Sequence, residues 1–174
     1  MTTNWNNLRY AVLVYFLILL FSGCTSGENV NAPVDLPEMA CQPADVTVDP
    51  PFTVGSTRTA VPPETFLADQ IKSYYGVQLV ENSLTNTTVY CDLFEMADEE
   101  TAIEMLVRTC SAPNMEKAAP PSTPVGEEVC ALEAVGYRMV NFRQGRVVVS
   151  ILGDFDGFGV DEWAVAVNGR LPAQ

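Results

Sequence analysis

The longest hydrophobic block of the chain lies near its start. Residues 10–21 form an unbroken apolar run of twelve, after a short polar segment whose only charge is Arg9. A twelve-residue helix is about 18 Å long, whereas the hydrocarbon core of a membrane is about 30 Å thick. The run is therefore short for a permanent span. It matches the apolar centre of a secretory signal, with an uncleaved anchor as the alternative.

The polar stretch that follows keeps neither a helical nor a strand period. Residues 24–59 are rich in Pro, Thr, Ser, Asn, Gly and Asp, which is typical of loops. We interpret this stretch as a tether for a single folded domain over residues 60–174. Cys41 is expected to pin its later half to that domain, which leaves residues 25–40 loose.

Residues 60–110 alternate between helical and strand periods. A helix is expected from Pro62 to Tyr74, because its apolar residues recur at three- and four-residue spacing and Gly76 suits a C-cap. Strands over residues 77–80 and 87–96 follow. Asp98 is the expected N-cap of a second helix that runs to Cys110 and has acidic residues in its first turn.

The rest of the chain predicts a long loop, three strands and a helix. Residues 111–126 form a proline-rich loop that is long for a compact domain, and loops of this length are either functional or mobile. Strands are expected over residues 129–134, 137–143 and 146–152, the last two joined at Gln144-Gly145, and a helix over 160–171. The order αββαβββα predicts an α+β fold, with helices packed on one face of an antiparallel sheet.

The end of the first apolar run carries a recognisable motif. Phe21-Ser22-Gly23-Cys24 resembles the lipobox of bacterial lipoproteins. The resemblance implies that residues 1–23 are a signal peptide, that the Cys24 thiol receives a diacylglyceryl group, and that cleavage precedes Cys24. Two or three acyl chains on one residue exceed what stable anchoring needs. We therefore expect a lipid-anchored protein on the extracytoplasmic side of the cell membrane.

Charge restricts the partners further. The chain has a formal net charge of −13 at pH 7. A surface this acidic is repelled by phosphate backbones and by anionic lipid headgroups. Nucleic acid is therefore not expected as a partner, and the lipid on Cys24 has to hold the protein to the membrane.

The remaining cysteines predict disulfides. Once Cys24 is lipidated, four are left, and an even number in an exported chain is typical of two bridges, with free buried thiols as the alternative. The favoured pairing joins Cys110 to Cys130 across the proline-rich loop, and Cys41 to Cys91. A rival pairing, Cys91–Cys110, places both residues at the same height on adjacent elements.

The residue types exclude several chemistries. The chain has no histidine, which removes imidazole-based catalysis and the usual zinc ligands. Asp154 to Glu162 is the one segment that resembles a Ca²⁺ loop, but Gly157 stands at the wrong position, so a turn before a helix is favoured. Tyr74, Tyr75 and Tyr137 are candidates for a pocket lining. We expect that the protein is not an enzyme, that it has no catalytic residue, and that it binds no metal and no cofactor.

The last part of the chain also shows a resemblance. The segment from Pro124 through the hairpin Phe142-Arg-Gln-Gly-Arg-Val-Val-Val-Ser to the final helix resembles the ending of uncharacterised bacterial lipoprotein and sensor-type extracytoplasmic domains. That resemblance implies an α+β envelope domain without a catalytic motif. We predict a non-catalytic binding or accessory module that holds an envelope protein or small ligand by a sheet face or by the 111–126 loop. The alternative is a hydrolase of cell-wall or glycan material that uses carboxylates alone.

Overall fold

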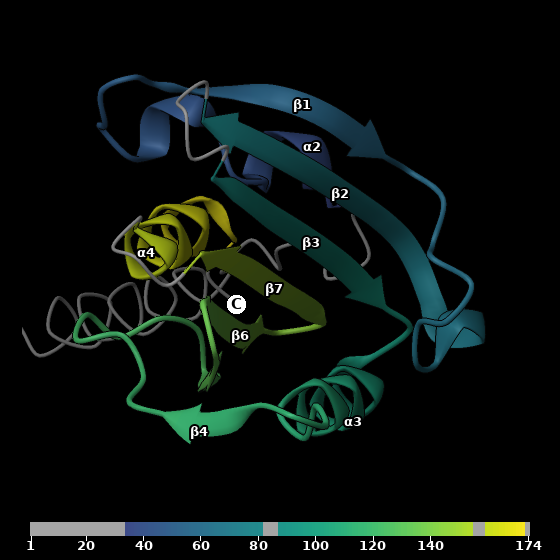
Figure 1. Ribbon diagram of the computed structural model, residues 1–174. Coiled ribbons are helices and arrows are strands. Elements are labelled where there is room, and N and C mark those ends of the chain that lie inside the picture. Colours follow the sequence, from purple (N-terminus) through teal and green to yellow (C-terminus); the bar gives the residue numbers. More distant parts are fainter. Residues whose placement is uncertain (1–33, 82–86, 155–158, 173–174) are drawn as a thin grey trace, which may run out of the picture. The chain divides into compact units, whose positions relative to one another are not determined.

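A seven-stranded antiparallel sheet dominates the computed structural model, which describes residues 34–81, 87–154 and 159–172. Its strand order is β1-β2-β3-β7-β6-β5-β4 (Figure 1). The α+β fold class is confirmed. The apolar run at residues 10–21 and Cys24 lie outside the described residues. Within the described part of the chain, no helix is long and apolar enough to cross a membrane.

In the described residues, three α-helices and two short 3₁₀ turns accompany the strands. The strands are β1 Phe52–Arg58, β2 Ile71–Glu81, β3 Thr88–Met96, β4 Glu116–Ala118, β5 Glu128–Ala134, β6 Tyr137–Gln144 and β7 Val147–Asp154. The helices are α2 Leu36–Met39, α3 Glu99–Thr109 and α4 Val160–Arg170, and the turns are η1 Pro43–Asp45 and η2 Ala68–Gln70.

One face of the sheet, which we call the α4 face, carries the larger core. Successive side chains of a strand point to opposite faces. The odd-numbered residues of β3, such as Cys91 and Leu93, pack with α2 and α4 in one buried cluster. Trp163 of α4 is fully buried there and meets the ring of Phe52 edge-on, with 4.8 Å between the ring centroids.

The opposite face, which we call the α3 face, carries a smaller core. Tyr74, Phe94 and Val148 pack there with Ala102 and Met105 of α3. The helix begins where the sequence indicates, because the Asp98 carboxylate accepts hydrogen bonds from the backbone N–H and the hydroxyl of Thr101. Figure 1 shows strands β3 and β7 lying between α3 and α4.

The expectation that all helices cover one face is therefore wrong. Val147, Val148 and Val149 are consecutive and all buried, so the central strand β7 needs cover on both sides. A continuous apolar run in a strand indicates burial on both faces. In this chain α3 supplies one cover, and α2 and α4 supply the other.

The expected helix over residues 62–74 is also wrong. Residues 71–81 form β2, which pairs along its length with β3. Gly76 is not a helix cap but lies inside the strand, where a Cβ would overlap the hydroxyl of Tyr74 and the carboxylate of Asp92. Cross-strand pairing of Tyr74 and Tyr75 decides the conformation, since β-rich segments owe much of their preference to such neighbours.

The domain boundary at residue 59/60 needs correction as well. Residues 34–174 form one compact unit, and Leu36, Cys41 and Phe52 are buried in its larger core. Arg170 of α4 ties this N-terminal segment down through a salt bridge to Asp45, at 2.7 Å between Nη1 and Oδ1. Scattered apolar residues thus anchor a segment that looks like a tether. Residues 24–33 lie outside the described part.

The remaining predicted elements agree with the structure. Strands β6 and β7 form the expected hairpin, and Gly145 at the turn has a φ of +54°, a conformation that favours glycine. Helix α4 closes the chain over Val160–Arg170. The 111–126 segment contains a short strand, β4, which pairs with β5.

Candidate functional site

Two disulfides link Cys41 to Cys91 and Cys110 to Cys130, which is the favoured pairing. The first is buried in the larger core, whereas both cysteines of the second are half-buried. The rival Cys91–Cys110 pairing is wrong, because Cys91 points to the α4 face while Cys110 lies on the α3 face. The sheet itself separates the two residues.

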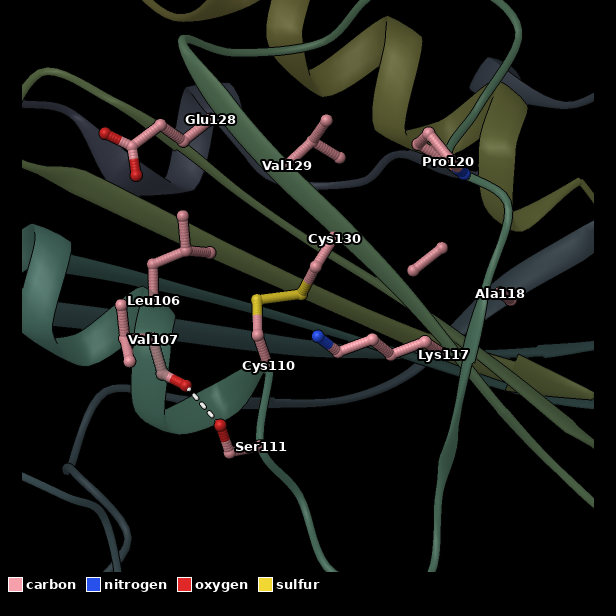
Figure 2. A pocket seen from close by; sticks show the side chains of 11 residues that line it. Leu106, Val107, Cys110, Ser111, Lys117, Ala118, Pro120, Glu128, Val129 and Cys130 are labelled. Atoms are coloured by element: carbon pink, nitrogen blue, oxygen red, sulfur yellow. Dashed lines mark hydrogen bonds between the residues drawn. A yellow bond between two sulfur atoms is a disulfide. The ribbon is translucent and has the colours of Figure 1, made fainter.

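A pocket of about 610 Å³ lies beside the Cys110–Cys130 bridge, and we call it the disulfide pocket. It is formed by the last turn of α3, by strand β4 with the chain that follows it, and by the first half of β5 (Figure 2). Its lining is mostly apolar and consists of Leu106, Val107, Cys110, Ser111, Lys117, Ala118, Pro120, Glu128, Val129, Cys130 and Ala131. The volume falls within the range of about 300–1,000 Å³ that is typical of small-molecule sites.

Strand geometry opens this pocket. Strand β4 pairs with only three residues of β5, Ala131 to Glu133, and the chain then leaves the sheet towards Pro120. Among the described residues, no strand pairs with the outer edge of residues 128–130. The space between that edge and α3 is therefore not filled by the sheet.

A buried polar side chain, Asn141, contacts the Cys110–Cys130 disulfide. Asn141 lies opposite Cys130 in the β5–β6 pair and is fully buried. Its Nδ2 donates to the Cys130 Sγ at 3.7 Å, and its Oδ1 has no hydrogen-bond partner within the described part of the chain. Above it, the Ser111 hydroxyl donates to the Val107 carbonyl at 2.9 Å and completes the end of α3.

The two charged residues of the disulfide pocket differ in their partners. Glu128 forms a salt bridge with Arg143, at 3.1 Å between Oε1 and Nη2. Arg143 forms a second salt bridge with Glu127, at 2.6 Å between Nη1 and Oε2. The carboxylate of Glu128 is therefore ion-paired, although it shares the single positive charge of Arg143 with Glu127. Lys117 makes no ion pair with any residue that the structure describes, and its stem runs along the pocket towards Cys110 (Figure 2).

A second pocket of about 360 Å³, which we call the acidic pocket, lies at the first turn of α4. Three carboxylates line it, and two of them are already paired: Asp45 with Arg170 at 2.7 Å and Asp161 with Arg138 at 2.8 Å. Glu162 is the third, and Pro121, Ser122, Thr123, Val165 and Ala166 complete the lining. The 111–126 segment therefore borders both pockets.

A tyrosine–aspartate pair lies on the α3 face, away from both pockets. The Tyr74 hydroxyl and an Arg58 guanidinium nitrogen, the latter at 3.0 Å, both donate to Oδ1 of Asp92. Burial raises the pKa of the Asp92 carboxyl above its ordinary value, although both hydrogen bonds oppose the shift. Burial and the hydrogen bond to Asp92 raise the pKa of Tyr74. Sequence reasoning singled out Tyr74 but missed Asp92, a lone acid inside a β-rich run.

The sequence-predicted cation segment is only partly described. Residues 155–158 lie outside the described residues, while Asp161 binds Arg138. Among residues 34–81, 87–154 and 159–172, no group of three Cys, Asp or Glu side chains is placed to hold a metal ion. Tyr137 is half exposed on the β5–β6 hairpin and lines neither pocket described above.

Comparison with known proteins adds a fold neighbour but no family. No protein-family model and no curated protein matches the chain. Among solved structures, it is similar to the extracellular domain of PknH from Mycobacterium tuberculosis, with a TM-score of 0.51 and 8% identity, over 68% of this chain and 84% of that chain. The likeness establishes a shared fold. Independently, two disulfides are typical of an extracytoplasmic domain.

Proposed function

We propose that this chain is a lipid-anchored extracytoplasmic module that binds a ligand in the disulfide pocket without changing it chemically. The lipid is attached to Cys24, and residues 34–174 form the binding domain. The partner is a small ligand or a segment of an envelope protein, and no cofactor, metal or nucleic acid takes part.

The location rests on three independent features. The lipobox-like ending at Cys24 follows an apolar run of signal length. Two disulfides are typical of exported domains. The fold neighbour is an extracellular domain. These features support an exported domain, and the lipobox supports the anchor.

The make-up of the disulfide pocket carries the binding proposal. Its walls are mostly apolar, and its one carboxylate, Glu128, is held in an ion pair with Arg143. General acid–base catalysis needs a titratable group within hydrogen-bond reach of a substrate proton. Apolar walls with few polar groups suit retention of a ligand better than its hydrolysis.

The anchor is tested by replacing its attachment point. Cys24→Ser, expressed in a bacterial host with labelled fatty acid, should leave a larger precursor without label. The Cys110→Ala/Cys130→Ala chain serves as control and should still be labelled. A Cys24→Ser chain that is matured and labelled like the parent would disprove lipidation at this residue.

The pocket is tested with the neutral apolar dye Nile red and a fragment of residues 34–174, which holds both cores and both disulfides. Val107→Trp should fill the pocket and abolish the dye's fluorescence gain. Val107 is 58% exposed, so the larger ring does not disturb the core. Val135→Trp, at a position 99% exposed, is the matched control and should bind dye like the parent.

The alternative function, a carboxylate hydrolase, has one observation in its favour. The acidic pocket gathers Asp45, Asp161 and Glu162. Asp45 and Asp161 each form a salt bridge with an arginine. Glu162 is therefore the acid that remains as a candidate for catalysis. Release of soluble sugars from purified cell wall, lost on Glu162→Gln, would replace the binding proposal. No release by the parent chain would end the hydrolase alternative.

A further inference from the structure

The partners of the basic side chains point to the kind of ligand. The chain has nine basic residues against twenty-two acidic ones. Each of the six arginines in the described part makes a salt bridge to a carboxylate: Arg58, Arg108, Arg138, Arg143, Arg146 and Arg170. Neither lysine, Lys72 or Lys117, makes a salt bridge with any residue that the structure describes. Of the two lysines without a salt bridge in the described part, Lys117 is the one that lines the disulfide pocket.

Lys117 lies where its charge can contact a bound ligand. Its side chain lines the disulfide pocket, and its ammonium group points towards the Cys110 end (Figure 2). A lysine stem can cover apolar surface while its head stays polar. The pocket therefore offers apolar walls from Leu106, Val129 and Ala131, together with one positive charge.

The end of α3 is the competing explanation for this charge. The C-terminus of a helix carries a partial negative charge, which favours a nearby cation. Three carbonyls in the last turn of α3 already have donors, however. Val107 accepts from the Ser111 hydroxyl, Arg108 from the Ser111 N–H, and Leu106 from the Cys110 N–H. These three carbonyls have donors other than Lys117, and no hydrogen bond joins the Lys117 ammonium group to the helix end in the described part.

The other charged residue of the pocket is paired with a residue other than Lys117. Glu128 is bound to Arg143, which in turn is buried and holds Glu127. The net charge of −13 repels anions in general. A preference for an anionic ligand would therefore have to come from the local charge of Lys117.

We infer that the disulfide pocket takes an amphiphile with a single alkyl chain and an anionic headgroup, whose charge pairs with Lys117. This inference rests on the proposed binding function and names its ligand class. A carboxylate or a phosphate monoester would supply the headgroup. The apolar walls hold the alkyl chain, as burial of apolar surface drives such binding.

The experiment compares three probes of equal chain length by calorimetry on the 34–174 fragment: decanoate, decyl phosphate and decanol. An anionic probe should bind about tenfold more tightly than decanol, a difference of about 1.4 kcal/mol. Lys117→Met should remove that difference and leave decanol binding unchanged. Lys72→Met replaces the other lysine, which lies outside the pocket, and should behave like the parent.

The outcomes separate the two proposals. Binding by both anionic probes supports recognition of charge alone, and binding by decyl phosphate without decanoate supports a phosphate-headed lipid as the source. Equal binding of decanol and the anions, or an anion preference that survives Lys117→Met, overturns the inference and leaves the binding function. If no probe binds, or if Val107→Trp binds all three like the parent, the proposed pocket fails as well.

Discussion

The two faces of the sheet each carry a disulfide, and the two bridges have different surroundings. On the α4 face, Cys41–Cys91 lies inside the larger core and joins the N-terminal segment to the central strands. On the α3 face, Cys110–Cys130 is half-buried and forms one wall of a pocket. The same covalent link stabilises a core in one place and shapes a surface in the other.

This difference follows from what covers each face. The α4 face is covered by α2 and α4, and its strand residues are buried throughout its centre. Among the described helices, α3 alone covers the α3 face, and the smaller cluster there includes Tyr74 and Phe94. Beyond that cluster lie polar residues such as Asp92 and Asn141. We therefore expect substitutions on the α4 face to change stability, and those on the α3 face to change binding as well.

The largest effect should come from breaking the core disulfide. Cys41→Ala/Cys91→Ala opens a link across 50 residues, and loss of that constraint costs roughly 4 kcal/mol in the loop-entropy account. Urea unfolding of the 34–174 fragment measures it. Dye binding by the folded fraction should match the parent. A variant that keeps full stability would show that the core holds the N-terminal segment without the bridge.

The pocket disulfide should have a smaller effect on stability and a larger one on binding. Cys110→Ala/Cys130→Ala removes a link across 20 residues, which costs roughly 3 kcal/mol by the same argument. Because the bridge forms a wall of the pocket, Nile red binding should weaken at the same time. Unchanged dye binding in a folded double variant would contradict the assigned role of this bridge.

A third prediction concerns the polar part of the α3 face. Gly76→Ala places a Cβ against the Tyr74 hydroxyl and the Asp92 carboxylate, and such overpacking costs about 1–3 kcal/mol. Tyr74→Phe removes the hydroxyl, so the cost of Gly76→Ala should fall in that background. A double-mutant cycle in urea measures the coupling. Strictly additive costs would show that the Tyr74 hydroxyl is not the obstacle.

The smallest effect should be a change in pH dependence. Burial raises the pKa of Asp92 in the folded chain, so the folded state binds its proton more tightly than the unfolded state. The resulting stability is present below the ordinary pKa of 3.8 and is lost as the pH rises through the folded pKa. Relative to the parent, Asp92→Asn should therefore gain stability as the pH rises from 3 to 7. Parallel curves of unfolding free energy for the two proteins would contradict the shift.

Local signals account for the elements that the sequence predicted correctly. Asp98 with Thr101 caps α3, and Gln144-Gly145 turns the β6–β7 hairpin. These features depend on residues close together in the chain. The disulfide pairing was also predictable in part, because Cys110 and Cys130 flank one loop.

Non-local contacts account for the errors. The spacing of apolar residues from Phe66 to Tyr74 satisfies a helix, but pairing with β3 makes the later part a strand. The segment around Leu36 and Phe52 carries few apolar residues, yet each one finds a place in the core. Such placements depend on partners far along the chain, which periodicity within one segment does not report.

The sequence by itself determined the fold class, the caps and turns, the negative charge and the exclusion of imidazole chemistry, because each depends on residue type or short spacing. Only the tertiary structure decided that helices cover both faces of the sheet and that Cys91 and Cys110 lie on opposite sides of it. It also decided that Lys117 stands unpaired in a pocket while the described arginines are paired. The face to which a strand residue points and the charge that it meets are set by the register between strands distant in sequence.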